Sequence, residues 1–140
     1  MQATREQIAQ MRLLSDGELY IEAQKFLQNY KPPENKQLAG LLEFSRDIND
    51  LQSFVKHQAG RKWVDSPKAH YETFYNELNK YLQKLRQQVK SPPHDLVMKG
   101  LTAKAEKDQV DFFAGWLARE FVQHLVAEAQ MQTSVATNQR

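Results

Sequence analysis

Residues 71–89, YETFYNELNKYLQKLRQQV, carry the clearest structural signal in the chain. Their apolar side chains recur every three or four positions, which is the period of an α-helix with one buried face. The stripe consists of Tyr71, Phe74, Tyr75, Leu78, Leu82, Leu85 and Val89. Ser66 and Pro67 precede it as a cap and a first helical residue, because proline's missing amide costs nothing there. We predict a long amphipathic helix here, with Lys80 and Lys84 on its polar face.

The rest of the chain shows the same helical period, and no strand-length alternation interrupts it. We expect a short helix over residues 5–14, a second begun by a Ser15 and Glu18 capping box, a third from Asn35 to Gly60, and a last one from Thr102. Proline pairs at 32–33 and 92–93 separate these segments, since proline cannot continue a helix. The prediction is an all-α fold, a single compact bundle of about five helices.

The length of 140 residues is that of one ordinary domain. We expect the helical domain to occupy residues 1–130. Beyond Met131 the sequence is polar and uncapped, so residues 131–140 are predicted to form a short disordered tail. Two alternatives stay open at Gly60, which either ends the third helix or lies where another backbone comes close.

Several classes of function lack the residues that they need. There is no cysteine, and the five glycines form no phosphate-binding loop. The histidines are scattered, and the carboxylates are interleaved with lysine and arginine as on a solvated helix face. We therefore expect a protein that is not an enzyme and holds no metal or cofactor. No apolar run is long enough to cross a bilayer and no signal peptide is visible, so we expect a cytoplasmic protein with no membrane partner.

Charge is unevenly distributed along the chain. Residues 51–107 carry eleven basic and five acidic side chains, a balance of +6, whereas residues 1–50 and 108–140 each balance to −2. An anionic partner is therefore expected at the middle segment. The candidate RNA-binding residues there are Arg61, Lys56, Lys62, Lys80 and Lys84. Charge alone favours the alternative of a solvated helix face, because such faces are common on soluble helices.

Aromatic residues suggest a second kind of contact. Trp63 could stack on a base or anchor a partner, but a tryptophan near a helix end more often packs on its own core. In the last helix Phe112 and Trp116 widen the apolar stripe, so that its aromatic residues, Phe113 and Phe121 included, cover more than one buried face requires. This suggests a partner interface formed by Phe112, Trp116 and Phe121. A five-helix core could equally bury all three.

Three segments share features with a known family. Residues 35–42, NKQLAGLL, combine a polar helix start with a leucine pair; residues 51–64, LQSFVKHQAGRKWV, contain a Gly60-Arg61 pair; and Phe112-Phe113 with residues 121–127, FVQHLVA, form an aromatic closing helix. In this order they resemble the small subunit of type III CRISPR effector complexes of the Csm (III-A) kind. Ala39 stands where the family usually has an arginine, and residues 67–90 differ, which points to a divergent branch.

The resemblance implies a non-catalytic helical subunit of an antiviral, RNA-guided complex. Such subunits self-associate in a stacked array, lie beside the other subunits of the complex, and hold guide RNA and target RNA. It also implies that Arg61, in the Gly-Arg pair, contacts RNA. The alternative is a helical adaptor or regulator that binds only protein through its last helix; it leaves the +6 segment unexplained.

Overall fold

The computed structural model describes residues 2–63 and 67–138. Within these residues lie six α-helices, one π-helical turn and no strand. The elements are α1 (Arg5–Leu14), the π-turn η1 (Ser15–Leu19), α2 (Tyr20–Asn29), α3 (Asn35–Phe44), α4 (Ile48–Ala59), α5 (His70–Gln88) and α6 (Ala103–Asn138). Because α1, η1 and α2 follow without a gap, they form one rod, and the described chain has five rods. The predicted all-α bundle is confirmed.

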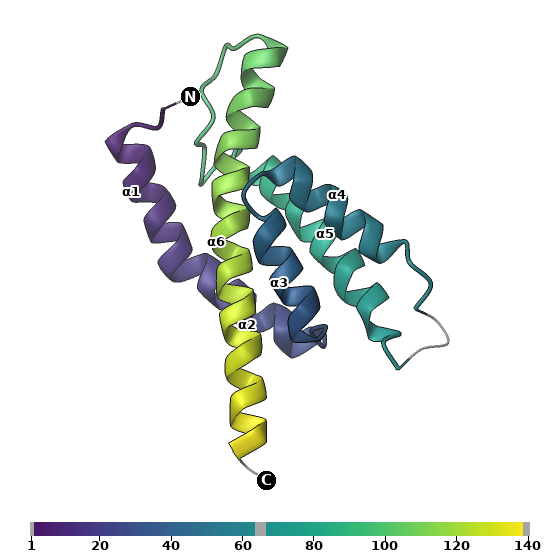
Figure 1. Cartoon of the computed structure of the whole chain (residues 1–140). Helices are drawn as coiled ribbons and strands as arrows, with labels where there is room; N and C mark the ends of the chain where they lie inside the picture. The colour runs from purple at the N-terminus through teal and green to yellow at the C-terminus, as the bar shows by residue number, and fades with distance from the viewer. Residues whose placement is uncertain (1, 64–66, 139–140) are drawn as a thin grey trace.

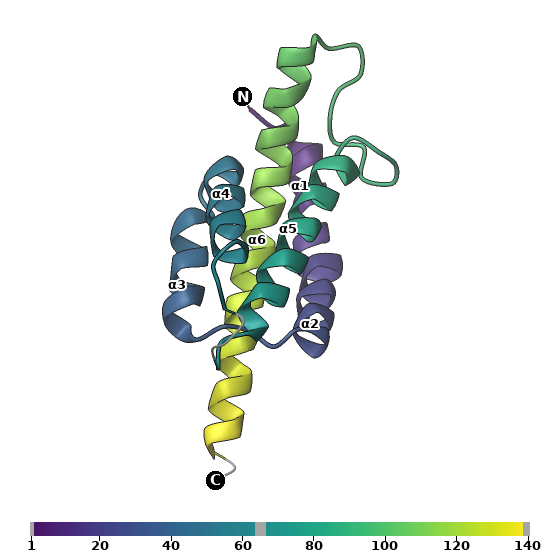
Figure 2. The same ribbon diagram turned by 90° about the vertical axis from the view of Figure 1, so that its right-hand side faces the viewer.

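Helix α6 is the axis around which the other helices are arranged (Figure 1). After a turn of 90°, α3 and α4 appear on one side of α6 and α2 on the other (Figure 2). Helix α5 packs against both α4 and α6. The C-terminal turns of α6 extend past the ends of the other helices in both views. Helix α6 continues to Asn138, and residues 131–138 contain no proline or glycine to break it.

The core forms where α5 and α6 face each other, with α2 alongside. All seven residues of the predicted α5 stripe are at most 3% exposed. Helix α6 adds Phe113, Leu117, Phe121 and Leu125, each at most 2% exposed. The helical turns of α5 start at His70, after a turn at 67–69; Ser66, the expected cap, lies outside the described residues.

The N-terminal rod starts with a capping box that the sequence analysis did not single out. The Gln7 amide donates to the Thr4 hydroxyl at 3.1 Å, and the Thr4 amide donates to the Gln7 side chain at 2.9 Å. The prediction that Ser15 caps a new helix was wrong, since Ser15 lies buried inside the rod. Its hydroxyl contacts side chains of α6 instead: the Ser15 Oγ atom lies 3.1 Å from both Glu120 Oε2 and His124 Nε2.

The π-turn η1 keeps the buried face of this rod in line. Buried residues recur four positions apart through the rod: Met11, Ser15, Leu19, Ala23 and Leu27. In an α-helix each step of four residues overshoots a full turn by about 40°, so four steps would drift by about 160°. A π-turn holds one more residue between its hydrogen-bonded groups than an α-turn does. The turn at residues 15–19 therefore offsets the drift.

The expected third helix from Asn35 to Gly60 is two helices, α3 and α4. The break falls at residues 45–47, where the Ser45 hydroxyl donates to the Leu42 carbonyl at 2.7 Å. Asp47 then caps α4, its Oδ1 accepting from the Asn49 and Asp50 amides at 2.8 and 3.1 Å. Serine and aspartate satisfy the backbone groups at this break, which the apolar periodicity alone did not reveal.

Two predicted helix ends are confirmed. Thr102 caps α6, because its hydroxyl accepts from the Ala105 amide at 3.2 Å. Gly60 ends α4 as its C-cap, and of the two alternatives for this glycine the helix end holds: a Cβ there would meet only carbonyl oxygens of its own helix. None of the described helices combines the length and apolar content needed to cross a membrane.

Candidate nucleic-acid interface

The end of α4 carries a tryptophan that packs inward. Trp63 is buried, and its indole Nε1 donates to the Gln58 carbonyl at 2.8 Å. Its ring centroid lies 4.9 Å from that of Tyr71 on α5. The packing alternative for Trp63 is therefore confirmed, and no base can stack on the buried ring. The indole fixes the residues after α4 against the start of α5.

Arg61 lies over this tryptophan with its charge available. Its guanidinium carbon stands 4.7 Å from the Trp63 ring centroid, within the range of a cation–π contact. Its NH1 group donates to the Gln58 side chain at 3.2 Å, and the residue as a whole is exposed. A guanidinium has five N–H donors, so most of them remain free for phosphate oxygens. The stacked geometry orders Arg61 without neutralising it.

Lys56 and Lys62 extend this positive end of α4. Both are exposed. Neither they nor Arg61 form an ion pair with a carboxylate of residues 2–63 or 67–138. We call these three residues, Lys56, Arg61 and Lys62, the α4 cationic end. Three uncompensated cations within seven residues favour a polyanionic ligand.

Lys80 and Lys84 occupy a different place on α5. With Glu77, they line a shallow pocket of about 230 Å³ that also contains aromatic side chains of α2 and α5. The Lys80 ammonium lies 3.0 Å from Glu77 Oε1 and is 70% exposed, so its charge is partly compensated. Within residues 2–63 and 67–138, no hydrogen bond or ion pair joins these two lysines to the α4 cationic end. The five predicted cations thus form two separate groups.

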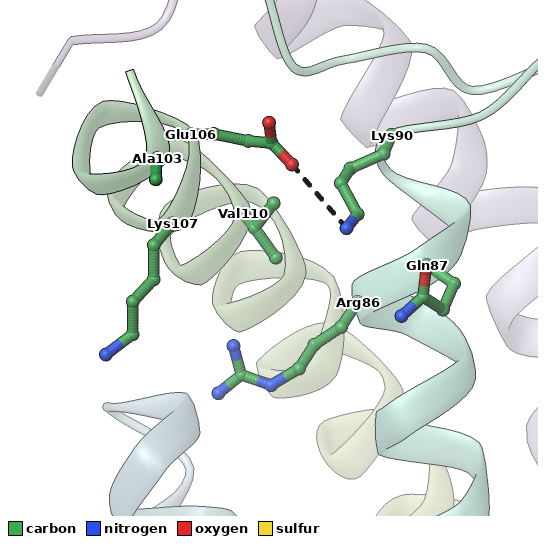
Figure 3. Close-up of a pocket in the computed structure, with 7 residues that line it drawn as sticks. All are labelled: Arg86, Gln87, Lys90, Ala103, Glu106, Lys107 and Val110. Carbon is green, nitrogen blue, oxygen red and sulfur yellow. Dashed lines mark ion pairs between the residues drawn. The ribbon is translucent and has the colours of Figure 1, made fainter. Parts of the chain in front are cut away.

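A third cationic group lies where α5 ends and α6 begins (Figure 3). The pocket there has a volume of about 290 Å³. Its lining residues are Arg86, Gln87, Lys90, Ala103, Glu106, Lys107 and Val110. Lys90 points toward Glu106, with Nζ and Oε1 at 3.6 Å (Figure 3). Lys107 was missed by the sequence analysis because it belongs to another helix; only the fold brings it to the end of α5.

The Arg86 side chain is fixed by contacts to two other helices. Its Nε donates to Gln52 Oε1 at 2.8 Å and its NH2 donates to Asn49 Oδ1 at 2.9 Å, both on α4. Its NH1 forms a short ion pair with Asp111 on α6. Arg86 therefore ties three helices together, and its charge is compensated within the protein.

The predicted partner-interface residues separate into two environments. Phe121 is fully buried and stacks on Tyr81 with ring centroids 3.9 Å apart. Assigning Phe121 to a partner surface was therefore wrong, because this side chain fills the core between α5 and α6. Phe112 and Trp116 are only half-buried and remain candidates.

The environment of Tyr81 leaves it protonated. Burial raises the pKa of Tyr81 far above its ordinary value, and the hydrogen bond that its hydroxyl donates to Glu22 raises it further. Burial likewise raises the pKa of Tyr75. Neither phenol can act as a base near neutral pH.

The Ser15 cluster contains catalytic residue types in an unproductive arrangement. Ser15 Oγ contacts both Glu120 and His124, but the serine is 3% exposed, so a substrate carbonyl has no access to it. The acid contacts the serine and not the imidazole, which is the reverse of a hydrolase triad. Over the described residues, no three histidine, aspartate or glutamate side chains are grouped as metal ligands. The cluster ties η1 to α6.

Comparison of the chain with protein-family models, with curated proteins and with solved structures gave no match. Support for a function therefore comes from the residues of this chain.

Proposed function

We propose that this chain is a non-catalytic RNA-binding subunit of a cytoplasmic type III CRISPR RNA-guided complex. In this role it stacks in several copies beside the other subunits and holds guide RNA and target RNA through phosphate contacts. The observation that carries the proposal is the α4 cationic end, which coincides with the Gly60-Arg61 pair of the family resemblance. The resemblance supports the identity of the complex, and the exposed cations support the contact with RNA.

Phosphate contacts of this kind need no base recognition. Each cation that neutralises a phosphate releases condensed counterions, so binding weakens steeply as salt rises. A rigid bundle with exposed lysine and arginine can hold RNA of any sequence in this way. The preordered guanidinium of Arg61 adds bidentate geometry that a lysine lacks.

The test is fluorescence anisotropy with a labelled 30-nucleotide single-stranded RNA at several salt concentrations. Replacing Arg61 by Ala is expected to weaken binding about three- to tenfold and to lower the salt slope by about 0.7, the value for one phosphate on a single strand. Arg61→Lys retains the charge and should keep the salt slope.

Two exposed cations away from the α4 cationic end, Arg5 and Lys25, supply the matched control. The double variant Arg5→Ala/Lys25→Ala should bind like the wild type. The double variant Arg61→Ala/Lys62→Ala should lower the salt slope by about 1.4, the value for two phosphates on a single strand. Thermal melting checks that each variant is folded. An unchanged binding curve for Arg61→Ala in a folded protein removes Arg61 from the interface.

Mild-salt purification of the tagged protein from its native cells tests the complex itself. Short RNAs that share a repeat-derived end, together with excess backbone subunits, support the proposal. A protein partner without RNA supports the helical adaptor instead.

A further inference from the structure

Phe112 and Trp116, both half-buried, form a ridge on α6 between two grooves. They stand four residues apart, so they are neighbours on one face of the helix, beside the fully buried residues Phe113 and Leu117. A groove of about 440 Å³ lies on the side of α1, and a groove of about 300 Å³ lies on the side of α4. Both are lined by Phe112 and Trp116. We call this surface the α6 ridge.

Each groove combines an aliphatic part beside Phe112 and Trp116 with polar side chains: Gln2 and Arg12 in the first, and Arg46, Asp47, Asp111 and Arg119 in the second. On the side of α1 the aliphatic part includes Ala3, Ile8 and Met11. On the side of α4 it includes Ile48 and Gly115, whose backbones come close: a Cβ at Gly115 would meet Ile48 Cβ at 3.6 Å. These aliphatic parts, with the two aromatic rings, accept apolar side chains.

Arginines surround the α6 ridge without an acidic partner. Arg12 lines the first groove, and Arg46 and Arg119 line the second. All three are exposed, and none pairs with a carboxylate in the described part of the chain. Three cations are therefore left uncompensated around an apolar surface.

The two carboxylates in the second groove are already engaged. Asp47 caps α4 through its hydrogen bonds to two backbone amides, and Asp111 pairs with Arg86. Asp47 keeps its negative charge, but it is a single carboxylate beside three arginines. The balance of charge at the ridge is therefore positive, and its complement is a ligand with carboxylates at the edges and apolar groups at the centre.

We propose that the α6 ridge docks a short amphipathic helix of a protein partner, with apolar side chains in the two grooves and glutamates or aspartates facing Arg12, Arg46 and Arg119. This is helix-in-groove recognition, in which apolar anchors give affinity and rim charges give specificity. The surface is distinct from the α4 cationic end, so the inference does not depend on RNA binding.

The test follows the two tryptophan indole signals in ¹H–¹⁵N NMR spectra. The probe is a synthetic 16-residue helical peptide with leucine and phenylalanine on one face and glutamate on both flanks. The Trp116 signal should shift on titration, while the signal of Trp63, buried and bonded to Gln58, should stay in place. Two control peptides replace the glutamates by lysine or the apolar residues by serine, and both should bind about tenfold more weakly or not at all.

Charge reversal at exposed positions tests the rim without disturbing the fold. Arg46→Glu/Arg119→Glu should weaken the acidic peptide about tenfold, and the matched double variant Lys25→Glu/Lys104→Glu, also at exposed positions, should leave it unchanged.

The proposal is overturned if the lysine peptide binds equally well or if the Arg46→Glu/Arg119→Glu variant binds the acidic peptide equally well. It is also overturned if the Trp116 signal does not shift with the peptide, whether or not it shifts with a uridine 16-mer RNA. Shifts that depend on protein concentration alone would assign the ridge to a second copy of this chain and would also overturn it.

Discussion

The start of α6 and the segment that follows it are held against the rest of the protein by different forces. Over residues 103–111, Glu106 pairs with Lys90 and Asp111 pairs with Arg86, and Val110 alone is buried. Over residues 113–129 the contacts are largely apolar, and Phe113, Phe121 and Leu125 are fully buried. Ion pairs at a partly exposed surface orient the helix but add little net stability, whereas buried apolar area gives most of the free energy of folding. Residues 113–129 therefore anchor α6, and its start positions it.

The largest expected effect comes from removing the anchor. Phe121→Ala should lower the free energy of unfolding by about 3–5 kcal/mol, because the lost ring leaves a cavity beside Tyr81. Urea denaturation followed by circular dichroism measures this loss. Phe112→Ala is the matched control on the same helix, and it should cost about 1 kcal/mol since that ring is half exposed. Equal losses for the two variants would contradict the distinction between core and ridge.

A smaller loss of stability is expected when the ion pairs at the start of α6 are broken. Asp111→Asn should cost about 2 kcal/mol, because Arg86 keeps its charge at 20% side-chain exposure and loses the carboxylate that compensates it. Glu106→Gln breaks the more exposed pair with Lys90 and should cost at most about 0.5 kcal/mol. Equilibrium unfolding of both variants in one buffer decides between them. If the Glu106 variant lost more, the positioning role of Arg86 would be wrong.

The smallest effect appears only at alkaline pH. The folded protein keeps Tyr81 neutral, because burial raises its pKa above the ordinary value of 10.0 that it regains on unfolding. Its contribution to stability is therefore complete below pH 10 and is lost as the pH rises, by about 1.4 kcal/mol at pH 11. Between pH 9 and pH 11 the wild type should lose about that much more stability than Tyr81→Phe. If the free energy of unfolding falls equally with pH in the two proteins, Tyr81 is not held neutral in the folded state.

The sequence revealed the elements that depend on local periodicity. The stripe of residues 71–89 is buried as predicted, and Thr102 caps α6 because one hydroxyl three residues from an amide suffices for a cap. Trp63 packs on the core of its own protein, which is more common for a tryptophan near a helix end than contact with a base or a partner.

Features that depend on contacts between distant segments could not be predicted. Ser15 looked like a cap because its neighbours fit the motif, but its partners, Glu120 and His124, are more than a hundred residues away. The break before Asp47 was hidden by an apolar row that continues across it. In the candidate site, Arg61 and Lys62 are exposed as a nucleic-acid contact requires, whereas the grooves beside Trp116 are formed by α1, α4 and α6 together and leave no local pattern.

The π-turn at residues 15–19 also determines which changes in chain length the N-terminal rod can absorb. Because the π-turn accommodates one extra residue, removing one residue there should restore an uninterrupted α-helix with α1 and α2 in nearly the same relative orientation. Met11 should then stay in the core, and Ile8 and Arg12 should keep their places beside Trp116. A single-residue deletion at Gly17, where the surroundings are open, should thus be tolerated, whereas a single-residue deletion in the regular helix α5 would rotate its two ends by about 100° and take part of its buried stripe out of the core.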